Sequence, residues 1–349
     1  MIVKENQPLA PMTTLGVGGP ARWYAEAWSE ADAAEAAESA GKRGVPFFVL
    51  GGGSNLVVSD SGFQGLVLHI RLQGIAVEDA GRERIFRAAA GEDWDGFVAR
   101  AVSENCAGVE CLAGIPGTVG GTPVQNVGAY GQEVEPVIER VRGFDLRRNE
   151  FVEFTAADCG FSYRRSRFNS EDRGRFVVTR VDYRLRPGGA PTVAYPDLQR
   201  ALGETNREPT LAEVADVVRR IRRSKGMLLV EGDPDCRSAG SFFKNPVITA
   251  EQFADISACS AAPPAYPAGP GRVKVPAAWL IEHAGFAKGY RLGGAGISSR
   301  HTLALINRGD DGRGGASAAE ILALAEKISA SVEERFGIRL EMEPVKLGF

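Results

Sequence analysis

The chain has 349 residues, 44% of them hydrophobic and 24% charged, which is typical of a soluble globular protein and excludes a fibrous or disordered chain. At roughly 150 residues per domain, this length predicts two or three domains. The formal net charge of −3 gives no general attraction to nucleic acid or to an anionic membrane, so the expected partner is a small molecule.

The first predicted elements are a helix over residues 29–44 and a strand over 45–50. Ser29 begins a capping box, the middle of the segment is rich in alanine, and Gly41 and Gly44 are expected to end the helix. The glycine-rich stretch LGGGSN that follows leads into a β-branched run and not into a helix. This order differs from the Rossmann fingerprint, in which glycines join a strand to a helix.

Further elements follow along the chain. A second helix is predicted at 94–102, where apolar residues recur at helical spacing, with its end near Gly108. Residues 175–185 alternate between apolar and charged side chains, which predicts a strand with one buried face. Capping boxes open a third helix at Thr210 and a fourth over 317–337.

The order of these elements predicts a mixed α+β fold, because helices and strands alternate without a strict βαβ rhythm. No internal repeat is evident. The best single domain boundary lies near 225–235, between a glycine-rich N-terminal part and a C-terminal part.

Two glycine-rich segments, LGGGSN (50–55) and AGIPGTVGGTPVQNVGAYG (113–131), are the first candidates for a binding site. Backbone amides without side-chain bulk can point donors at phosphate oxygens, and glycine lets a ligand approach closely. Neither segment has the Rossmann or the P-loop pattern, and tight turns alone would explain one of them. Nucleotide binding is favoured by the polar residues within them, Ser54, Asn55, Thr118, Thr122, Gln125 and Asn126.

Other polar groups give weaker signals. The basic run at 219–225 ends a predicted helix, where the helix dipole favours cations in any case. The stretch FSYRRSRF (161–168) indicates an anion site or simply a surface. His69, His283 and His301 show no mutual pattern.

The segment SAGSFFKNP (238–246) breaks the alternation of a half-buried strand, because Phe242 and Phe243 are adjacent. Ser241 and Lys244 form a small polar cluster on a constrained turn, of the kind that orients a proton donor. A serine that bonds only to a nearby backbone group would give the same pattern. Ser241 also lacks the G-x-S-x-G elbow of a Ser-His-Asp hydrolase.

The cysteine pattern and the apolar runs bear on the compartment. The five cysteines include no C-x-x-C pair and no histidine at zinc-finger spacing, so neither a disulfide scaffold nor a metal site is expected. The start, MIVKENQPLAP, lacks a signal pattern, and no apolar run approaches the ~20 residues of a membrane span. We therefore expect a reduced, cytoplasmic protein.

Taken in order, several segments resemble the UDP-N-acetylenolpyruvoylglucosamine reductase family over essentially the whole chain. Each segment is weak alone, but the ordered set is specific. The matching segments are LGGGSNLVVSD (50–60), AGIPGTVGGTPVQNVGAYGQE (113–133), FSYRRSRF (161–168), AYPDL (194–198), RRSK (222–225), GSFFKNP (240–246), AWLIEHAGFAKGY (278–290) and LEMEPVKLG (340–348).

The resemblance implies a fold. It is a vanillyl-alcohol-oxidase-type FAD-binding region over 1–225, made of two α+β subdomains at about 1–70 and 71–225. A smaller α+β substrate-binding domain over 226–340 and a tail over 341–349, which carries a catalytic glutamate, complete the chain.

The resemblance also implies an activity, that of a UDP-N-acetylmuramate dehydrogenase. NADPH would reduce non-covalently bound FAD, and the reduced flavin would pass hydride to the enolpyruvyl double bond of UDP-N-acetylglucosamine enolpyruvate. The product, UDP-N-acetylmuramate, is a precursor of peptidoglycan. A monomer that binds neither nucleic acid nor membrane is expected.

Residue roles follow from the same resemblance. Arg164 would contact the substrate carboxylate, Ser241 would donate a proton, and Glu343 would be the third catalytic group. The residues expected to hold FAD are Gly51, Gly52, Gly53, Ser54, Asn55, Gly114, Ile115, Pro116, Gly117, Gly120, Gly121, Gly128, Ala129, Tyr130 and Arg222. Those expected to hold the substrate are Tyr195, Lys225, Asn245, Tyr266 and Lys274, the last two in a loop typical of the longer of two family types.

Two positions depart from the family pattern, and two other functions stay open. Lys346 is the cation nearest to Glu343, where many members have an arginine near the flavin, and Ser238 stands where asparagine is frequent. A sugar or alcohol oxidase on the same fold would often bind its flavin covalently; no histidine lies in 44–68, although His69 is close. A non-catalytic nucleotide-binding module is the other alternative.

Overall fold

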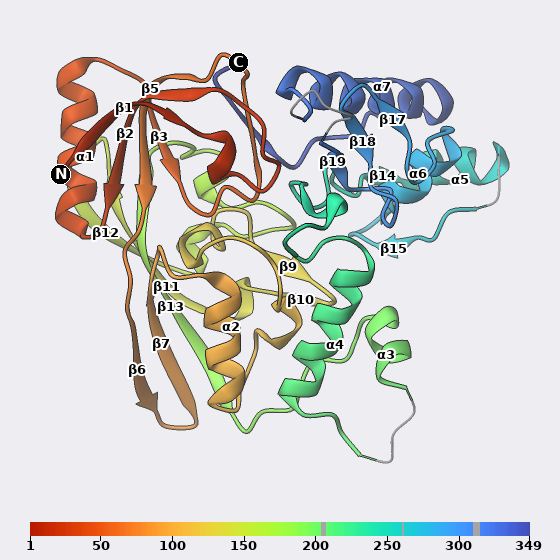
Figure 1. The fold of residues 1–349 in the computed structure, drawn as a ribbon. Coiled ribbons are helices and arrows are strands. Elements are labelled where there is room, and N and C mark those ends of the chain that lie inside the picture. Colours follow the sequence, from red (N-terminus) through yellow and green to blue (C-terminus); the bar gives the residue numbers. More distant parts are fainter. Residues whose placement is uncertain (204–206, 260–261, 310–314) are drawn as a thin grey trace. The chain divides into compact units, whose positions relative to one another are not determined.

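The computed structural model describes residues 1–203, 207–259, 262–309 and 315–349 (Figure 1). The chain forms two compact units. Unit 1 comprises Met1–Gln7, Pro20–Gly53 and Phe63–Ser224, and unit 2 comprises Pro8–Gly19, Ser54–Gly62 and Lys225–Phe349. Among the described residues, none of the helices has the length and hydropathy of a bilayer-spanning segment.

Unit 1 contains a small sheet in the order β1-β2-β5-β3. Its strands are β1 (Val3–Pro8), β2 (Pro20–Ala27), β3 (Phe47–Leu50) and β5 (Phe63–Ile70), and both β2 and β3 run parallel to β5. Helix α1 (Glu30–Arg43) packs its buried alanines against β2 and β5 (Figure 1). The parallel pairs are possible because α1 forms the crossover between β2 and β3.

The two ends of α1 test the start and the end predicted for this helix. The Ser29 hydroxyl accepts a hydrogen bond from Asp32 N–H, as the predicted capping box requires. Gly44 adopts φ 63° and ends the helix, whereas Gly41 lies inside it, so the prediction that Gly41 helps to end the helix is wrong. The left-handed residue that stops a helix stands just past its last turn, and only Gly44 occupies that position.

A larger antiparallel sheet follows in the order β12-β11-β13-β7-β6, with β8 (Cys106–Ala107) pairing at the end of β13. Its other strands are β6 (Ile75–Ala80), β7 (Glu83–Ala89), β11 (Ile138–Asp145), β12 (Glu150–Thr155) and β13 (Phe176–Pro187). Along β13 the side chains of Val177, Val181 and Tyr183 are fully buried, which confirms the predicted apolar face. The expected charged face is only partly open, because Asp182 is 3% exposed and accepts from Arg180 at 2.7 Å.

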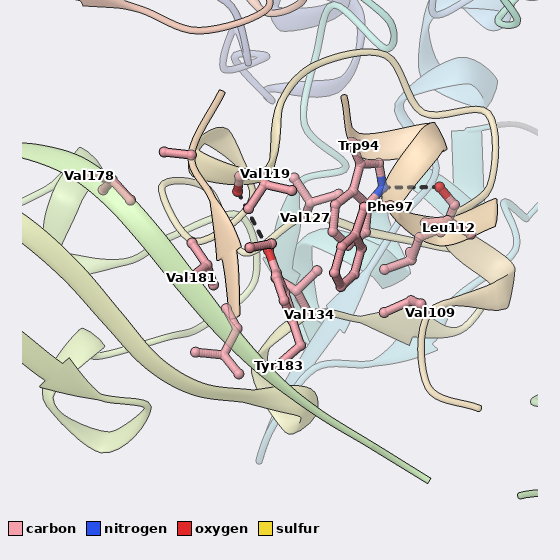
Figure 2. Close-up of a cluster of buried hydrophobic side chains, with 14 of the residues drawn as sticks. Trp94, Phe97, Val109, Leu112, Val119, Val127, Val134, Val178, Val181 and Tyr183 are labelled. Carbon is pink, nitrogen blue, oxygen red and sulfur yellow. Dashed lines mark hydrogen bonds between the residues drawn. The ribbon is translucent and has the colours of Figure 1, made fainter. Parts of the chain in front are cut away.

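The core of unit 1 lies between this sheet and α2 (Trp94–Ser103). Figure 2 shows Trp94 and Phe97 of α2 beside Tyr183 of β13. The Trp94 and Phe97 rings stack with 5.3 Å between their centroids, and the Phe97 and Tyr183 centroids are 4.6 Å apart. The Trp94 indole N–H donates to the Leu112 carbonyl at 3.2 Å. The helix ends at Ser103, five residues before the expected end at Gly108, because the chain then turns into β8.

The remaining helices of unit 1 are α3 (Pro196–Leu202) and α4 (Leu211–Ser224), which pack against each other. Two short strands, β9 (Gly128–Ala129) and β10 (Gln132–Glu133), pair as a small hairpin. Helix α4 spans the predicted third helix, and its C-terminal turn contains Arg222 and Arg223.

The described residues of unit 2 form short strands and three α-helices around a second core. The strands are β4 (Leu56–Val58), β14 (Val247–Thr249), β15 (Tyr266–Pro267), β16 (Arg272–Lys274), β17 (Arg291–Leu292), β18 (Ala295–Ile297), β19 (Leu305–Asn307) and β20 (Val345–Leu347). The helices are α5 (Ala250–Cys259), α6 (Ala277–His283) and α7 (Ala318–Phe336). Helix α7 begins after a capping box at Ser317 and ends at Gly337 with φ 66°, as predicted.

Candidate active site

Gly51 and Gly52 of the first glycine-rich segment lie against Gly117 and Thr118 of the second, within unit 1. A Cβ atom placed on Gly52 would stand 2.6 Å from the Gly117 Cα atom, and one on Gly51 would stand 2.8 Å from the Thr118 hydroxyl. Real Cβ atoms do not come so close to backbone, so side chains at these positions would force the two segments apart. Glycine is therefore required here for close contact, and residues 51–53 and 114–121 together are called the glycine cradle.

Several of the cradle's amides bond inside the protein, among them that of Val119, which donates to the Glu92 carbonyl at 2.9 Å. Gly114 N–H donates to Asp95 Oδ1 at 2.7 Å, Gly120 N–H to the Ala90 carbonyl at 2.9 Å, and Gly121 N–H to the Thr118 carbonyl at 2.9 Å. What these three residues offer to a ligand is close approach. Donors to a phosphate would have to come from their neighbours in the cradle.

Two of the polar residues that favoured nucleotide binding also have partners within unit 1. The Thr122 hydroxyl donates to the Val119 carbonyl at 2.8 Å and lies 2.6 Å from the Tyr183 hydroxyl. Asn126 is fully buried and bonds to Ser162 and other protein groups. Both side chains stabilise the fold of the segment that contains them.

Arg222 places a buried positive charge against the cradle. The end of α4 lies beside Gly114, and Arg222 Nε donates to the Gly114 carbonyl at 2.8 Å although the residue is only 6% exposed. Burial lowers the pKa of the Arg222 guanidinium, and Tyr130 and Asp95 act in the opposite direction. A buried cation beside a glycine-rich cradle fits an anionic ligand such as a dinucleotide, because cations form strong charge-assisted hydrogen bonds with phosphate oxygens.

Arg164 lies in the loop predicted from FSYRRSRF, with a left-handed backbone at φ 55°. Its Nη2 donates to the Gly128 carbonyl at 2.6 Å and its Nη1 to the Asn126 carbonyl at 3.4 Å. The Asn169 side chain donates to the Arg164 carbonyl at 3.1 Å. The guanidinium is therefore held in one plane by two carbonyls of the second glycine-rich segment.

Tyr195 stands in front of α3 and contacts the same segment. Its ring meets that of Tyr130 edge to face at 5.4 Å, and it is 38% exposed. The buried Glu110 carboxylate holds the chain segment that leads to Tyr195. Glu110 Oε1 accepts from Thr192 N–H at 2.8 Å and from the Gln132 side chain at 3.1 Å. The sequence did not single out Glu110 or Gln132, because nothing in it connects positions so far apart.

Ser241 and Glu343 lie on paired backbone in unit 2. Phe243 and Met342 form an antiparallel bridge, and Glu343 N–H donates to the Phe242 carbonyl at 2.9 Å. Asn55 joins this pair, because its side chain donates to the Glu343 carbonyl at 3.2 Å. Three predicted site residues that are far apart in the sequence are thereby brought together within unit 2.

The neighbours of Ser241 explain the unusual SAGSFFKNP segment. Phe242 and Phe243 are buried, at 0% and 1% exposure, in the core of unit 2. Lys244 Nζ lies 2.5 Å from Glu341, and Asn245 Oδ1 accepts from Ala277 N–H at 2.9 Å at the start of α6. The adjacent phenylalanines therefore anchor a turn whose polar residues have protein partners of their own.

The other predicted substrate residues of unit 2 are spread over its surface. Tyr266 and Lys274 face each other across β15 and β16, and Tyr266 is 49% exposed. Lys225 begins the long C-terminal part of unit 2, next to Gly226, which packs against Asp235. Lys346 is exposed, with Nζ 5.8 Å from the Phe349 ring.

Unit 1 thus holds the glycine cradle, Arg164, Tyr130, Tyr195 and Arg222, whereas Ser54, Asn55, Ser241, Glu343 and the remaining substrate residues belong to unit 2. His69, considered for a covalent flavin link, lies with Nδ1 2.8 Å from the Tyr24 hydroxyl. Within the described residues, no group of side chains could hold a metal ion.

Known families match both parts of the chain. The model of the UDP-N-acetylenolpyruvoylglucosamine reductase C-terminal domain matches residues 233–347, and that of an FAD binding domain matches residues 21–147. The first match lies in unit 2, and the second covers both glycine-rich segments in full. Flavin binding is thereby supported independently of the motifs.

Full-length relatives agree with these matches. The chain is 47% identical to the UDP-N-acetylenolpyruvoylglucosamine reductase of Streptomyces coelicolor, over 99% of this chain and 90% of the relative. It is 46% identical to that of Thermobifida fusca, over 99% and 98%. The solved reductase from Thermus caldophilus is 27% identical, with a TM-score of 0.66 over 99% of this chain and 100% of that one.

These findings confirm the resemblance and the expected fold, an FAD-binding region with a further C-terminal domain. Identity of 41% or more persists over nearly the whole chain in relatives from several bacterial genera. The chain therefore belongs to the UDP-N-acetylenolpyruvoylglucosamine reductase family.

Proposed function

We propose that the chain reduces UDP-N-acetylglucosamine enolpyruvate to UDP-N-acetylmuramate, with FAD as its cofactor and NADPH as the source of electrons, in the synthesis of peptidoglycan precursors. Family membership over 99% of the chain supports this activity and both cofactors. The observation that carries the assignment of residues is the pairing of the Ser241 segment with the Glu343 segment. A monomeric state and a cytoplasmic location are part of the same proposal.

The cradle and Arg222 suit an FAD molecule. Gly51 to Gly53 and the segment from Gly114 to Gly121 would lie along its diphosphate, because the glycines in them have no side chain to block close approach. Arg222 would offset the phosphate charge, with Tyr130 next to it. Bound FAD supplies the hydride-transfer chemistry between NADPH and the enolpyruvyl double bond.

Arg164 would bind the carboxylate of the enolpyruvyl group. Addition of hydride to the β-carbon pushes negative charge towards that carboxylate, so a fixed positive charge stabilises the transition state more than the ground state. A guanidinium suits this role because it stays protonated and has five N–H donors in one plane. Its bonds to the Gly128 and Asn126 carbonyls set that plane before the substrate arrives.

Ser241 would supply the proton that completes the reduction. The carbon left after hydride addition is strongly basic, so even a hydroxyl can protonate it when held within about 3 Å. The buried pair Phe242 and Phe243 fixes the backbone of this turn. Glu343, in its protonated form, would donate a further hydrogen bond to the developing charge.

Replacing the proton donor tests the assignment. Ser241→Ala is expected to leave the protein yellow and reducible by NADPH under anaerobic conditions, because the flavin site is untouched. Reoxidation by UDP-N-acetylglucosamine enolpyruvate, followed by stopped-flow absorbance, is expected to slow by about 10²- to 10⁴-fold.

The matched control is Ser103→Ala, which removes an exposed hydroxyl at the end of α2 and should change neither half-reaction. Normal reoxidation of Ser241→Ala would refute the role of this serine. A purified protein that takes up no flavin would refute the proposed activity as a whole.

A further inference from the structure

Three residues other than glycine have a left-handed backbone around the proposed carboxylate contact. They are Asn126 at φ 45°, Tyr130 at φ 50° and Arg164 at φ 55°. Asparagine tolerates this conformation, but tyrosine and arginine adopt it only where surrounding contacts hold them there. Contacts around Arg164 therefore keep its backbone in this conformation.

Asn126 joins three pieces of backbone. It is fully buried, and its Nδ2 donates to the Ser162 carbonyl at 3.2 Å and to Glu133 Oε2 at 3.0 Å, with Glu135 Oε2 at 3.4 Å. Its Oδ1 accepts from Glu135 N–H at 3.1 Å. Both ends of one amide side chain thus bond to groups that lie 7 to 36 positions away.

These bonds enclose Arg164 from two sides. Ser162, whose carbonyl bonds to the Asn126 side chain, stands two residues before Arg164 and on the same loop. The Asn126 main-chain carbonyl accepts from Arg164 Nη1 at 3.4 Å, and the nearby Gly128 carbonyl accepts from Nη2 at 2.6 Å. Asn126 therefore contacts both the loop that carries Arg164 and the end of its side chain.

We propose that Asn126 is a positioning residue that sets where the Arg164 guanidinium lies. This inference rests on the proposed role of Arg164 as the carboxylate contact. Asparagine is suited to the position because it has a donor for the Ser162 carbonyl, an acceptor for Glu135 N–H, and a backbone that tolerates positive φ. Neither nucleotide binding nor proton transfer is assigned to it.

The decisive variant is Asn126→Asp, which keeps the size of the side chain. An ionised aspartate places an acceptor against the Ser162 carbonyl and the Glu133 carboxylate, where Asn126 has its donor. The loop is then expected to shift and to move the guanidinium. A displacement of about 1 Å at a contact of this kind costs up to about 10²-fold in rate.

The expected result separates the two half-reactions. Asn126→Asp should bind FAD and be reduced by NADPH within about twofold of the unchanged protein, since Arg164 takes no part in that step. Reoxidation by the enolpyruvyl substrate should slow by about 10- to 100-fold. In the Arg164→Lys background, the same substitution should add less than about threefold, because its effect passes through Arg164.

Two controls isolate the side chain. Asn126→Gly keeps a backbone suited to positive φ but removes the amide, and it should also slow reoxidation. Asn149→Asp changes an exposed asparagine with φ 56° in the turn between β11 and β12 and should change nothing. If Asn126→Asp cannot be purified with flavin, Asn126→Gly serves as the test variant.

The inference is overturned if Asn126→Asp and Asn126→Gly reoxidise at the normal rate. It is equally overturned if flavin content and NADPH reduction fall as much as reoxidation does, or if the effect is fully additive with Arg164→Lys, since either outcome indicates a merely structural residue. Normal reoxidation of Arg164→Lys and Arg164→Ala would instead refute the proposed role of Arg164.

Discussion

Asp145 shows how a buried charge in unit 1 depends on its partners. It is 1% exposed, and Arg175 donates to it from Nη2 at 2.6 Å and from Nε at 3.1 Å. The N–H groups of Arg147 and Arg148 bond to the same carboxylate. The Arg175 hydrogen bond is the main cause that holds the pKa of Asp145 at about 2.

This lowered pKa predicts a loss of stability in acid. The contribution is fully present above the unfolded-state pKa of about 4 and is lost as pH falls through the folded-state pKa of about 2. Asp145→Asn should therefore be less stable than the unchanged protein at pH 6, and should lose less stability between pH 4 and pH 2. Urea unfolding at pH 6, 4, 3 and 2 measures both.

The control for this prediction is Asp216→Asn, at an exposed position on α4. Its stability should follow that of the unchanged protein across the series. Parallel curves for Asp145→Asn and the unchanged protein would contradict the argument.

At the scale of single residues, the sequence offers candidates for the chemistry but not for the residues that hold them in place. Arg164, Ser241 and Glu343 could be proposed from motifs because their neighbours along the chain are distinctive. Asn126 was grouped with candidate nucleotide contacts, yet its side chain bonds to Ser162, 36 positions away. A sequence does not show whether a polar side chain near glycines faces a ligand or a distant loop.

At the scale of elements, α2 connects the core of unit 1 to the glycine cradle. Its first residue, Trp94, stacks on Phe97 and is 1% exposed. The main-chain N–H of Trp94 donates to the Gly117 carbonyl at 3.1 Å. Asp93, which caps the helix, forms an antiparallel β-bridge with Thr118. Packing of α2 therefore sets where the second glycine-rich segment begins.

Trp94→Ala is expected to lower the free energy of unfolding by about 3–5 kcal/mol, because it leaves a large cavity in a packed core. Flavin content should fall as well, since the start of α2 holds Gly117. Trp28→Ala, at a tryptophan that is 58% exposed, should cost about 1 kcal/mol or less. Urea unfolding of the three proteins compares them, and equal costs for both substitutions would refute the packing argument.

Elements with local signals were predicted well, and those with distant partners were not. Helix α7 spans Ala318–Phe336 and was predicted from its capping box and its terminal glycine. Strands of two or three residues, such as β9 and β18, carry no periodicity and exist only because a partner strand lies beside them. The end of α2 was missed for the same reason, since β8 pairs with β13, about 80 residues later.

At the scale of the whole molecule, the two units are interleaved along the chain. Unit 2 includes Pro8–Gly19 and Ser54–Gly62 in addition to its long C-terminal part. Strand β4 pairs in parallel with β20, and the Asp60 carboxylate accepts from Ala318 N–H at 2.7 Å at the start of α7. The buried Asn307 side chain donates to the Leu15 carbonyl at 3.2 Å. Unit 2 therefore depends on N-terminal residues that lie more than 200 positions before their C-terminal partners in the sequence.

This interleaving predicts that residues 225–349 will not fold when they are produced alone. The fragment lacks Leu15, Val17 and Val57 from its core, and without β4 it leaves β20 unpaired. It also loses the Asp60 bonds to α7, so the N–H groups at that helix end depend on the Ser317 capping box alone. We expect weak near-UV circular dichroism, poorly dispersed amide NMR signals and no cooperative thermal transition, whereas the full chain should show all three native features. A fragment with dispersed signals and a sharp transition would contradict this prediction. It would show that the core formed by residues 225–349 alone is enough to stabilise unit 2 without Pro8–Gly19 and Ser54–Gly62.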